Sequence, residues 1–279
     1  MPNVHIFCAE HQARSPLDPR SRFTHQRIMD LKAVQDNWNR FGKTDPFWAV
    51  LAWPGMEEGR WDVDAFFATG REEIAEVMAL IEQLQLHPAP TKALDFGCGV
   101  GRLTQALADY FQEVHGVDIS ESMLALARGL NQHPDRCQYH LNPRDDLSIF
   151  PDNEFDFVYS TITLQHMPPR YARSYILELM RVCKPGGVLV FQIPSRPKHP
   201  IQRALRPLKP TRLWRWYQKL RYGDQPVMNM YGIPKEKVMH LIEQHGCHLV
   251  HLEPDQRADQ AWESYRYVVE KPLTSPTPR

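Results

Sequence analysis

The chain has 279 residues, a length that favours one core domain with appended segments over two large domains. Apolar residues make up 42% of the sequence and charged residues 24%, which excludes a fibrous or a wholly disordered chain. The 33 basic and 33 acidic residues balance, and a net charge of zero argues against a protein that coats nucleic acid. The five cysteines form no Cys-x-x-Cys pair, so we expect no disulfide framework, no metal site and a cytoplasmic location.

The first 70 residues predict an extension followed by a helical cap. Residues 1–24 are polar and broken by prolines, so a poorly ordered lead-in is expected there. Residues 25–50 are predicted to be helical, with a break at Asp45-Pro46 because the residue before a proline avoids the helical conformation. This stretch is rich in aromatic residues, namely Trp38, Phe41, Phe47 and Trp48.

From residue 71 onward, helices and strands alternate. The predicted helices cover residues 71–86, 102–111, 121–130, 171–183 and 234–245. The predicted strands cover residues 93–96, 114–118, 155–160, 188–193, 247–252 and 264–270, and Pro185-Gly186-Gly187 is predicted to be a turn. Such alternation indicates a parallel sheet with helices on both faces. Residues 271–279 are predicted to be a disordered tail.

The segment from Asp95 to Gly101 reads as a strand that enters a glycine loop, which in turn opens a helix. Glycines let the backbone turn sharply and let a ligand approach closely. A dinucleotide-binding fingerprint, Gly-x-Gly-x-x-Gly, would place its third glycine where this chain has Arg102. Asp95 would repel a pyrophosphate but would tolerate a cofactor that carries an ammonium and a sulfonium. The loop therefore disfavours a hydride-transferring enzyme.

Asp118 ends the next predicted strand, 17 residues after Gly101. A carboxylate at this place can accept hydrogen bonds from both hydroxyls of a ribose. The alternative is that Asp118 only caps the following helix. Cys98, inside the glycine loop, is interpreted as a small loop residue because no basic residue stands beside it to activate a nucleophile.

Five ordered motifs resemble the class I S-adenosylmethionine-dependent methyltransferases. The similar segments are Leu94–Gly101, Gly116–Ser120 with Met123, Phe155–Ser160, Leu164–His166 and Arg181–Gly187, within residues 71–194. The resemblance implies an α/β fold, Rossmann-like and doubly wound, with a mostly parallel seven-stranded sheet and helices on both faces. It divides the chain into an N-terminal extension and helical cap (1–70), a methyltransferase domain (71–270) with an inserted basic helical segment (196–231), and the tail.

The resemblance also implies roles for single residues toward S-adenosylmethionine, whose demethylated product is S-adenosylhomocysteine. The loop residues Gly97, Cys98, Gly99 and Gly101 would line the methionine and ribose portions, and Asp95 would bind the amino group, directly or through water. Asp118 would bind the ribose, and Ile119 and Met123 would flank the adenine. Asn142 takes the place where the family usually has an acid toward the adenine, and Gln165 would touch cofactor or substrate.

His166 follows the fourth strand at the ligand-binding end of the expected sheet. Its ordinary pKa lies near physiological pH, so it is the candidate general base for an oxygen acceptor. The alternative is a structural histidine that bonds the loop backbone.

Two classes of function fit these residues. The first is an active methyltransferase on a small-molecule or lipid- or phosphate-linked acceptor, with oxygen as the expected acceptor atom. The second is a non-catalytic binding or scaffolding protein on the same fold. The intact glycines, Asp95 and Asp118 favour the enzyme.

Residues 196–231 hold nine Lys and Arg against one acid, a local net charge of +8. A helix over residues 211–222 would place Leu213, Trp216, Tyr217 and Leu220 on one face and Arg212, Arg215 and Lys219 on another. This pattern predicts peripheral contact with an anionic membrane or binding of an anionic acceptor. The alternative is a solvated basic face, and nucleic acid is disfavoured because this is the single basic patch.

Overall fold

The computed structural model describes residues 19–199, 220, 223, 225–257 and 260–273. The start of the predicted lead-in, most of the basic segment 196–231 with its amphipathic helix, and the tail from residue 274 lie outside the described residues.

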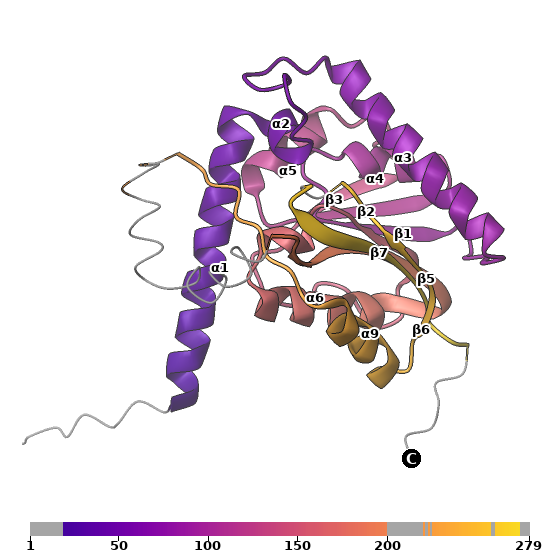
Figure 1. Ribbon diagram of the computed structural model, residues 1–279. Coiled ribbons are helices and arrows are strands. Elements are labelled where there is room, and N and C mark those ends of the chain that lie inside the picture. The colour runs from indigo at the N-terminus through magenta and orange to yellow at the C-terminus, as the bar shows by residue number, and fades with distance from the viewer. Residues whose placement is uncertain (1–18, 200–219, 221–222, 224, 258–259, 274–279) are drawn as a thin grey trace, which may run out of the picture.

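Helices and strands alternate through the middle of the chain, as predicted (Figure 1). The helices are α1 (Pro19–Thr44), α2 (Pro46–Val50), α3 (Val63–Gln83), α4 (Arg102–Leu107), α5 (Glu121–Gly129), α6 (Pro169–Val182) and α9 (Lys235–Gln244), with a short 3₁₀ turn η1 (Leu164–His166). The strands are β1 (Lys92–Phe96), β2 (Glu113–Asp118), β3 (Cys137–Leu141), β4 (Phe155–Ser160), β5 (Cys183–Pro197), β6 (His248–Pro254) and β7 (Trp262–Glu270).

The seven strands form one sheet in the order β3-β2-β1-β4-β5-β7-β6. The first five strands of this order pair in parallel, and β7 pairs antiparallel with both β5 and β6. The predicted mostly parallel seven-stranded sheet is therefore confirmed. The chain reverses its winding direction between β1 and β4, and ligands of such sheets bind at the carboxyl ends of the strands at this point.

Alternation along each strand gives the sheet two buried faces. In β1, Leu94 and Phe96 pack with residues of α6 and α9, whereas Ala93 packs with residues of α3 and α4. Figure 1 shows α3 above the sheet and α6 and α9 below it. The helices thus cover both faces, as the βαβ pattern predicts.

Several element boundaries differ from the prediction, and strand β3 was not among the strands predicted by range. Helix α1 begins at Pro19, inside the stretch expected to be a poorly ordered lead-in, so residues 19–24 are helical. Helix α4 ends at Leu107, earlier than the predicted 111. The Pro185-Gly186-Gly187 segment is part of the long strand β5, where the pairing with β4 shifts register, and is not the predicted turn.

Helix α3 begins at Val63, eight residues before the predicted start at 71. The side chain of Asp62 caps it by accepting a hydrogen bond from the Ala65 amide at 2.9 Å. Gly70 lies within this helix and faces Arg102. A Cβ atom at this position would come within 2.5 Å of the Arg102 carbonyl oxygen, so the close packing requires glycine. The helix crosses the expected boundary at residue 70.

The N-terminal cap consists of α1 and α2. Hydrogen bonds made by Gln35 and Asn39 of α1 hold it against the residues that follow β2. Gln35 donates to the Ile119 carbonyl at 3.1 Å. The Oδ1 atom of Asn39 accepts from the hydroxyl of Ser120 at 3.0 Å, and its backbone oxygen accepts from Ser122 Oγ at 2.9 Å. The break at Asp45-Pro46 is confirmed, and it turns α2 back toward the glycine loop.

Candidate active site

One cavity of about 940 Å³ of empty space, measured out to its open mouth, lies at the carboxyl ends of β1, β2 and β4. This is the place where the strand order reverses. The cap covers it, because Leu31, Val34 and Trp38 of α1 and Val50 of α2 line its wall. Both the strand ends and the cap therefore define the site.

The glycine loop turns back at the end of β1. The amides of Gly97 and Cys98 both donate to the Val117 carbonyl, at 2.8 and 3.0 Å. Gly97 and Gly99 adopt φ angles of +81° and +54°, which other residues rarely adopt. A side chain at Gly97 would collide with Thr163, and one at Gly99 would lie 2.6 Å from Val50. The loop therefore requires glycine for its conformation and for its packing.

Asp118 lies at the end of β2 and lines the cavity. Its carboxylate accepts hydrogen bonds from the Gly99 amide at 2.9 Å and from the Ser120 amide at 2.8 Å. Burial raises the pKa of this carboxyl, while these backbone donors act in the opposite direction. Each carboxylate oxygen keeps a further lone pair for a ligand hydroxyl. Ile119 and Met123 line the wall beside it.

Asp95 and Gly101 lie behind the loop, outside the residues that line the cavity. Asp95 is buried and accepts a hydrogen bond from Thr104 Oγ1 at 2.7 Å, and burial raises its pKa to about 7. A side chain at Gly101 would collide with the Tyr139 hydroxyl. Asn142 does line the wall, but its amide donates to the Asp146 carbonyl and accepts from the Arg144 amide. It therefore holds its own loop in place.

A chain of hydrogen bonds defines the tautomer of His166. The Ile162 amide can only donate, and it donates to Gln192 Oε1 at 3.0 Å, which orients the Gln192 side chain. Gln192 Nε2 then donates to Gln165 Oε1 at 3.2 Å, and Gln165 Nε2 donates to His166 Nε2 at 3.1 Å. His166 Nδ1 therefore carries the proton and donates it to the Asn229 carbonyl at 2.9 Å.

His166 lines the cavity, and Trp38 of the cap packs against its ring, with the centroids 5.2 Å apart. Burial lowers the pKa of its imidazole to about 4, so the ring is neutral near pH 7. Gln165 is buried behind His166 and lies outside the cavity wall. Its described side-chain partners are His166 and Gln192.

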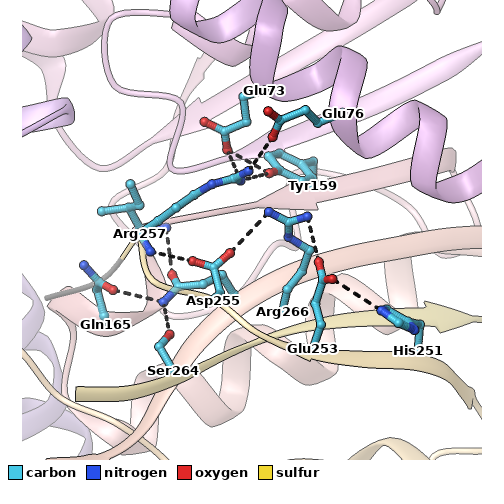
Figure 2. A network of polar contacts seen from close by, with 12 residues as sticks. Glu73, Glu76, Tyr159, Gln165, His251, Glu253, Asp255, Arg257, Ser264 and Arg266 are labelled. Atoms are coloured by element: carbon cyan, nitrogen blue, oxygen red, sulfur yellow. Dashed lines mark hydrogen bonds and ion pairs between the residues drawn. The ribbon is translucent and has the colours of Figure 1, made fainter. Parts of the chain in front are cut away.

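Arg102, which begins α4 and lines the cavity, was not among the site residues predicted from the sequence. Arg102 is buried and donates to Glu73 Oε2 at 2.7 Å. Burial alone would raise the pKa of Glu73, but Arg102 and Arg257 outweigh it and lower that pKa. Figure 2 shows Arg257, which comes from the β6–β7 connection, directed at Glu73 and the Tyr159 hydroxyl. This network braces the start of α4 from behind the site.

Thr161 and the cap residues that line the cavity, such as Val50, were also not predicted as site residues. The aromatic cluster over residues 25–50 was the available signal for the cap. No signal in the sequence distinguished Thr161 from the other hydroxyl residues after β4.

The fold and the glycine loop define an α/β domain that binds a nucleotide-type cofactor at the ends of its parallel strands. Comparison with known proteins makes this more specific, since residues 94–191 match the methyltransferase domain family. The chain is 33% identical over 167 residues to the 2-methyl-6-phytyl-1,4-hydroquinone methyltransferase of Synechocystis sp. (60% of this chain, 51% of the relative). It is 30% identical over 157 residues to the trans-aconitate 2-methyltransferase of Acidovorax sp. (56% of this chain, 58% of the relative).

Among solved structures, the fold is similar to that of the magnesium protoporphyrin IX methyltransferase of Synechocystis PCC 6803 with bound SAH. The TM-score is 0.57 at 20% identity, and the match covers 86% of this chain and 98% of that chain. Residues 94–191 therefore match a methyltransferase domain, and the chain has the fold of a solved methyltransferase that binds the demethylated form of S-adenosylmethionine. The chain spans about half the length of the curated relatives it matches.

The residues around the cavity fit this cofactor. The glycine loop leaves its backbone uncovered by side chains, and Asp118 retains acceptor capacity for ribose hydroxyls. Ile119 and Met123 offer an apolar surface of the kind that an adenine ring requires. In the described part of the chain, no helix combines the length and apolar content that crossing a bilayer requires.

Proposed function

We propose that this chain is an active methyltransferase that transfers a methyl group to the hydroxyl oxygen of an uncharged, largely apolar small molecule. The observation that carries the proposal is a cavity that has the cofactor-binding loop on one side and an apolar wall on the other. S-adenosylmethionine would supply a methyl group activated by its sulfonium: the S–CH3 bond breaks as the O–CH3 bond forms, S-adenosylhomocysteine is released, and the hydroxyl proton passes to water at the open mouth of the cavity. The protein contributes alignment of the two partners and exclusion of water.

The charges of the wall support an uncharged acceptor. Arg102 is the one Lys or Arg among the described residues that line the cavity, and Glu73 already neutralises it. A tricarboxylate such as the one named for the Acidovorax relative would find no uncommitted cation there. Leu31, Val34 and Met167 instead offer a surface for a ring, as in the hydroquinone named for the Synechocystis relative.

We further propose that His166 positions the site and does not act as the general base expected from the sequence. Its Nε2 lone pair already accepts from Gln165, and its Nδ1 proton is donated to Asn229. A pKa of about 4 makes the ring a weak proton acceptor. A base role would require Gln165 to release its hydrogen bond.

The peripheral contact with anionic membrane predicted for residues 196–231 stays a proposal, as does a lipid-linked acceptor. Leu220, within this segment, is 71% exposed. Sedimentation with anionic and neutral vesicles over a salt series tests it. Binding to the anionic vesicles alone, weakened by salt, is the expected result.

The enzyme proposal is tested in two stages. Isothermal titration should show binding of S-adenosylmethionine and S-adenosylhomocysteine, and no binding of NAD. Mass spectrometry of reactions with a panel of hydroquinones, naphthols and tricarboxylates should then show a mass gain of one methyl group on a hydroxylated ring. Binding of the cofactor without methylation of any compound would favour the non-catalytic alternative.

A further inference from the structure

The wall of the cavity after β4 is not needed for the cofactor. Its role, argued below, rests on the proposed function. Apart from Gln165, the residues expected to bind the cofactor lie in or after β1, β2 and β3, which are neighbours on one half of the sheet. Strand β4 lies on the other side of β1. The residues directly after β4 therefore border the cavity where an acceptor would meet the methyl-bearing end of the cofactor.

Three hydroxyl side chains stand at this strand end. Ser160 Oγ donates to the Phe96 carbonyl at 3.0 Å. Thr163 Oγ1 donates to the Thr161 carbonyl at 3.0 Å and to the Gly97 carbonyl at 3.4 Å. Ser160 therefore bonds to the end of β1. Thr163 bonds within its own loop and to the glycine loop.

The third hydroxyl, that of Thr161, differs from the other two. Thr161 lines the cavity, its residue is 8% exposed, and its Oγ1 has no hydrogen-bond partner within the described chain. Buried hydroxyls without a partner are rare because desolvation is not compensated. Solvent does not reach this Oγ1 in the structure, so a ligand hydroxyl would supply the missing partner once the Thr161 side chain turns its Oγ1 toward the cavity.

The next residue is held in an unfavourable conformation that shapes this wall. Ile162 has a φ of +54°, in the left-handed region that β-branched residues avoid. Its amide is anchored on Gln192 Oε1 at 3.0 Å, and Gln192 is itself buried and anchored on Gln165 and Ser264. Backbone strain of this kind persists where the surroundings impose it and is frequent at ligand sites.

We propose that Thr161 is the acceptor-binding residue of this enzyme and takes a compound with a ring hydroxyl. The acceptor hydroxyl donates to Thr161 Oγ1, which leaves the lone pairs of the acceptor oxygen free to point toward the methyl group. The apolar wall beside it, with Trp38 and Met167, holds the ring. A compound of the same shape without the hydroxyl leaves Thr161 unpaired and binds more weakly.

The test uses the protein saturated with S-adenosylhomocysteine and two probes, 1-naphthol and naphthalene, with dissociation constants measured by fluorescence. Wild type should prefer 1-naphthol. Thr161→Val, which has nearly the same shape, should weaken 1-naphthol binding roughly 5- to 10-fold and change naphthalene binding by less than about 2-fold. Thr161→Ser keeps the hydroxyl and should keep the preference.

Each other outcome overturns the inference in a recognisable way. Equal affinity of wild type for both probes, or an unchanged preference in Thr161→Val, removes the hydroxyl contact. Weaker binding of S-adenosylhomocysteine by Thr161→Val would place the hydroxyl on the cofactor instead. The wild-type comparison of the two probes needs no variant, so it stands even if Thr161→Val does not fold. Failure of wild type to bind S-adenosylhomocysteine at all contradicts the proposed function itself.

Discussion

The two sides of the cavity are built in different ways. The cofactor side consists of one loop and two strand ends, and its contacts are mostly backbone hydrogen bonds within residues 97–120. The acceptor side brings together α1, the turn after β4, and the segment around Asn229, which are far apart in the sequence. A local motif can specify the first side by itself. The second side exists only after the whole domain has folded.

The largest expected effect concerns the network behind the cofactor side. Glu73→Gln removes a carboxylate that accepts hydrogen bonds from Arg102, Arg257 and the Tyr159 hydroxyl, and it leaves the buried guanidinium of Arg102 without a counter-charge. The free energy of unfolding should fall by about 3–5 kcal/mol, measured by urea denaturation.

The matched control is Glu76→Gln, one turn along the same helix. Glu76 is 70% exposed and pairs with Arg257 at 3.3 Å, so its loss should cost less than about 1 kcal/mol. If the two variants lose the same stability, the buried network does not support the start of α4 as described.

The second effect is a pH dependence on the acceptor side. The pKa of His166 lies near 4 in the folded protein because of burial, below its ordinary value of about 6.5. The unfolded chain therefore binds more protons between these two values, so stability is complete above about pH 6.5 and is lost as the pH falls toward 4. The loss attributable to this ring is up to roughly 3 kcal/mol.

Thermal or urea unfolding of wild type and His166→Gln at pH 7.5, 6, 5 and 4 measures this. The difference in unfolding free energy between them should shrink as the pH falls, since glutamine does not titrate. A difference that stays constant over this range would mean that the ring is solvated and titrates normally.

The third effect breaks the cofactor side. Asp118→Ala removes the acceptor for the ribose hydroxyls, and S-adenosylhomocysteine should bind more weakly by roughly 1–3 kcal/mol in isothermal titration. Asp109→Ala, which changes an exposed acid, should bind as wild type does. Unchanged affinity in Asp118→Ala would support the alternative that this carboxylate only holds the Gly99 and Ser120 amides.

The same difference between the two sides explains what the sequence could predict. The glycine loop and Asp118 follow from short motifs with fixed local geometry, and the predicted mostly parallel seven-stranded sheet is confirmed. The assignment of single residues to the cofactor stays a prediction. The early start of α3 was visible in principle, because Asp62 precedes it as a capping residue.

The acceptor side could not be predicted in the same way. The protonated nitrogen of His166 depends on Asn229, 63 residues later, and on the orientation of Gln192. The unpaired hydroxyl of Thr161 depends on which carbonyls its neighbours already occupy. Such facts arise from long-range packing, and a single sequence does not encode them in any local pattern.

The smallest expected effect concerns the pair of hydrogen bonds between Asn37 of the cap and the backbone of Val227, which we call the clasp. Asn37 Nδ2 donates to the Val227 carbonyl at 3.0 Å, and the Val227 amide donates to Asn37 Oδ1 at 2.9 Å, so one side chain pairs with the backbone as a strand would. Asn37→Ala breaks both bonds, worth about 1 kcal/mol each at most in net terms, and it does so at one edge of the acceptor side. Hydrogen exchange of the Val227 amide should therefore accelerate by roughly 5- to 30-fold, whereas exchange in β1 and the affinity for S-adenosylhomocysteine should stay near wild type.

Asp36→Asn is the control on the same helix, because Asp36 pairs with Lys32 at the surface and touches neither side of the cavity. Slower cofactor binding or weaker cofactor affinity in Asn37→Ala would show that the clasp serves the whole site, and the division into a locally specified cofactor side and an assembled acceptor side would then be wrong at the cap.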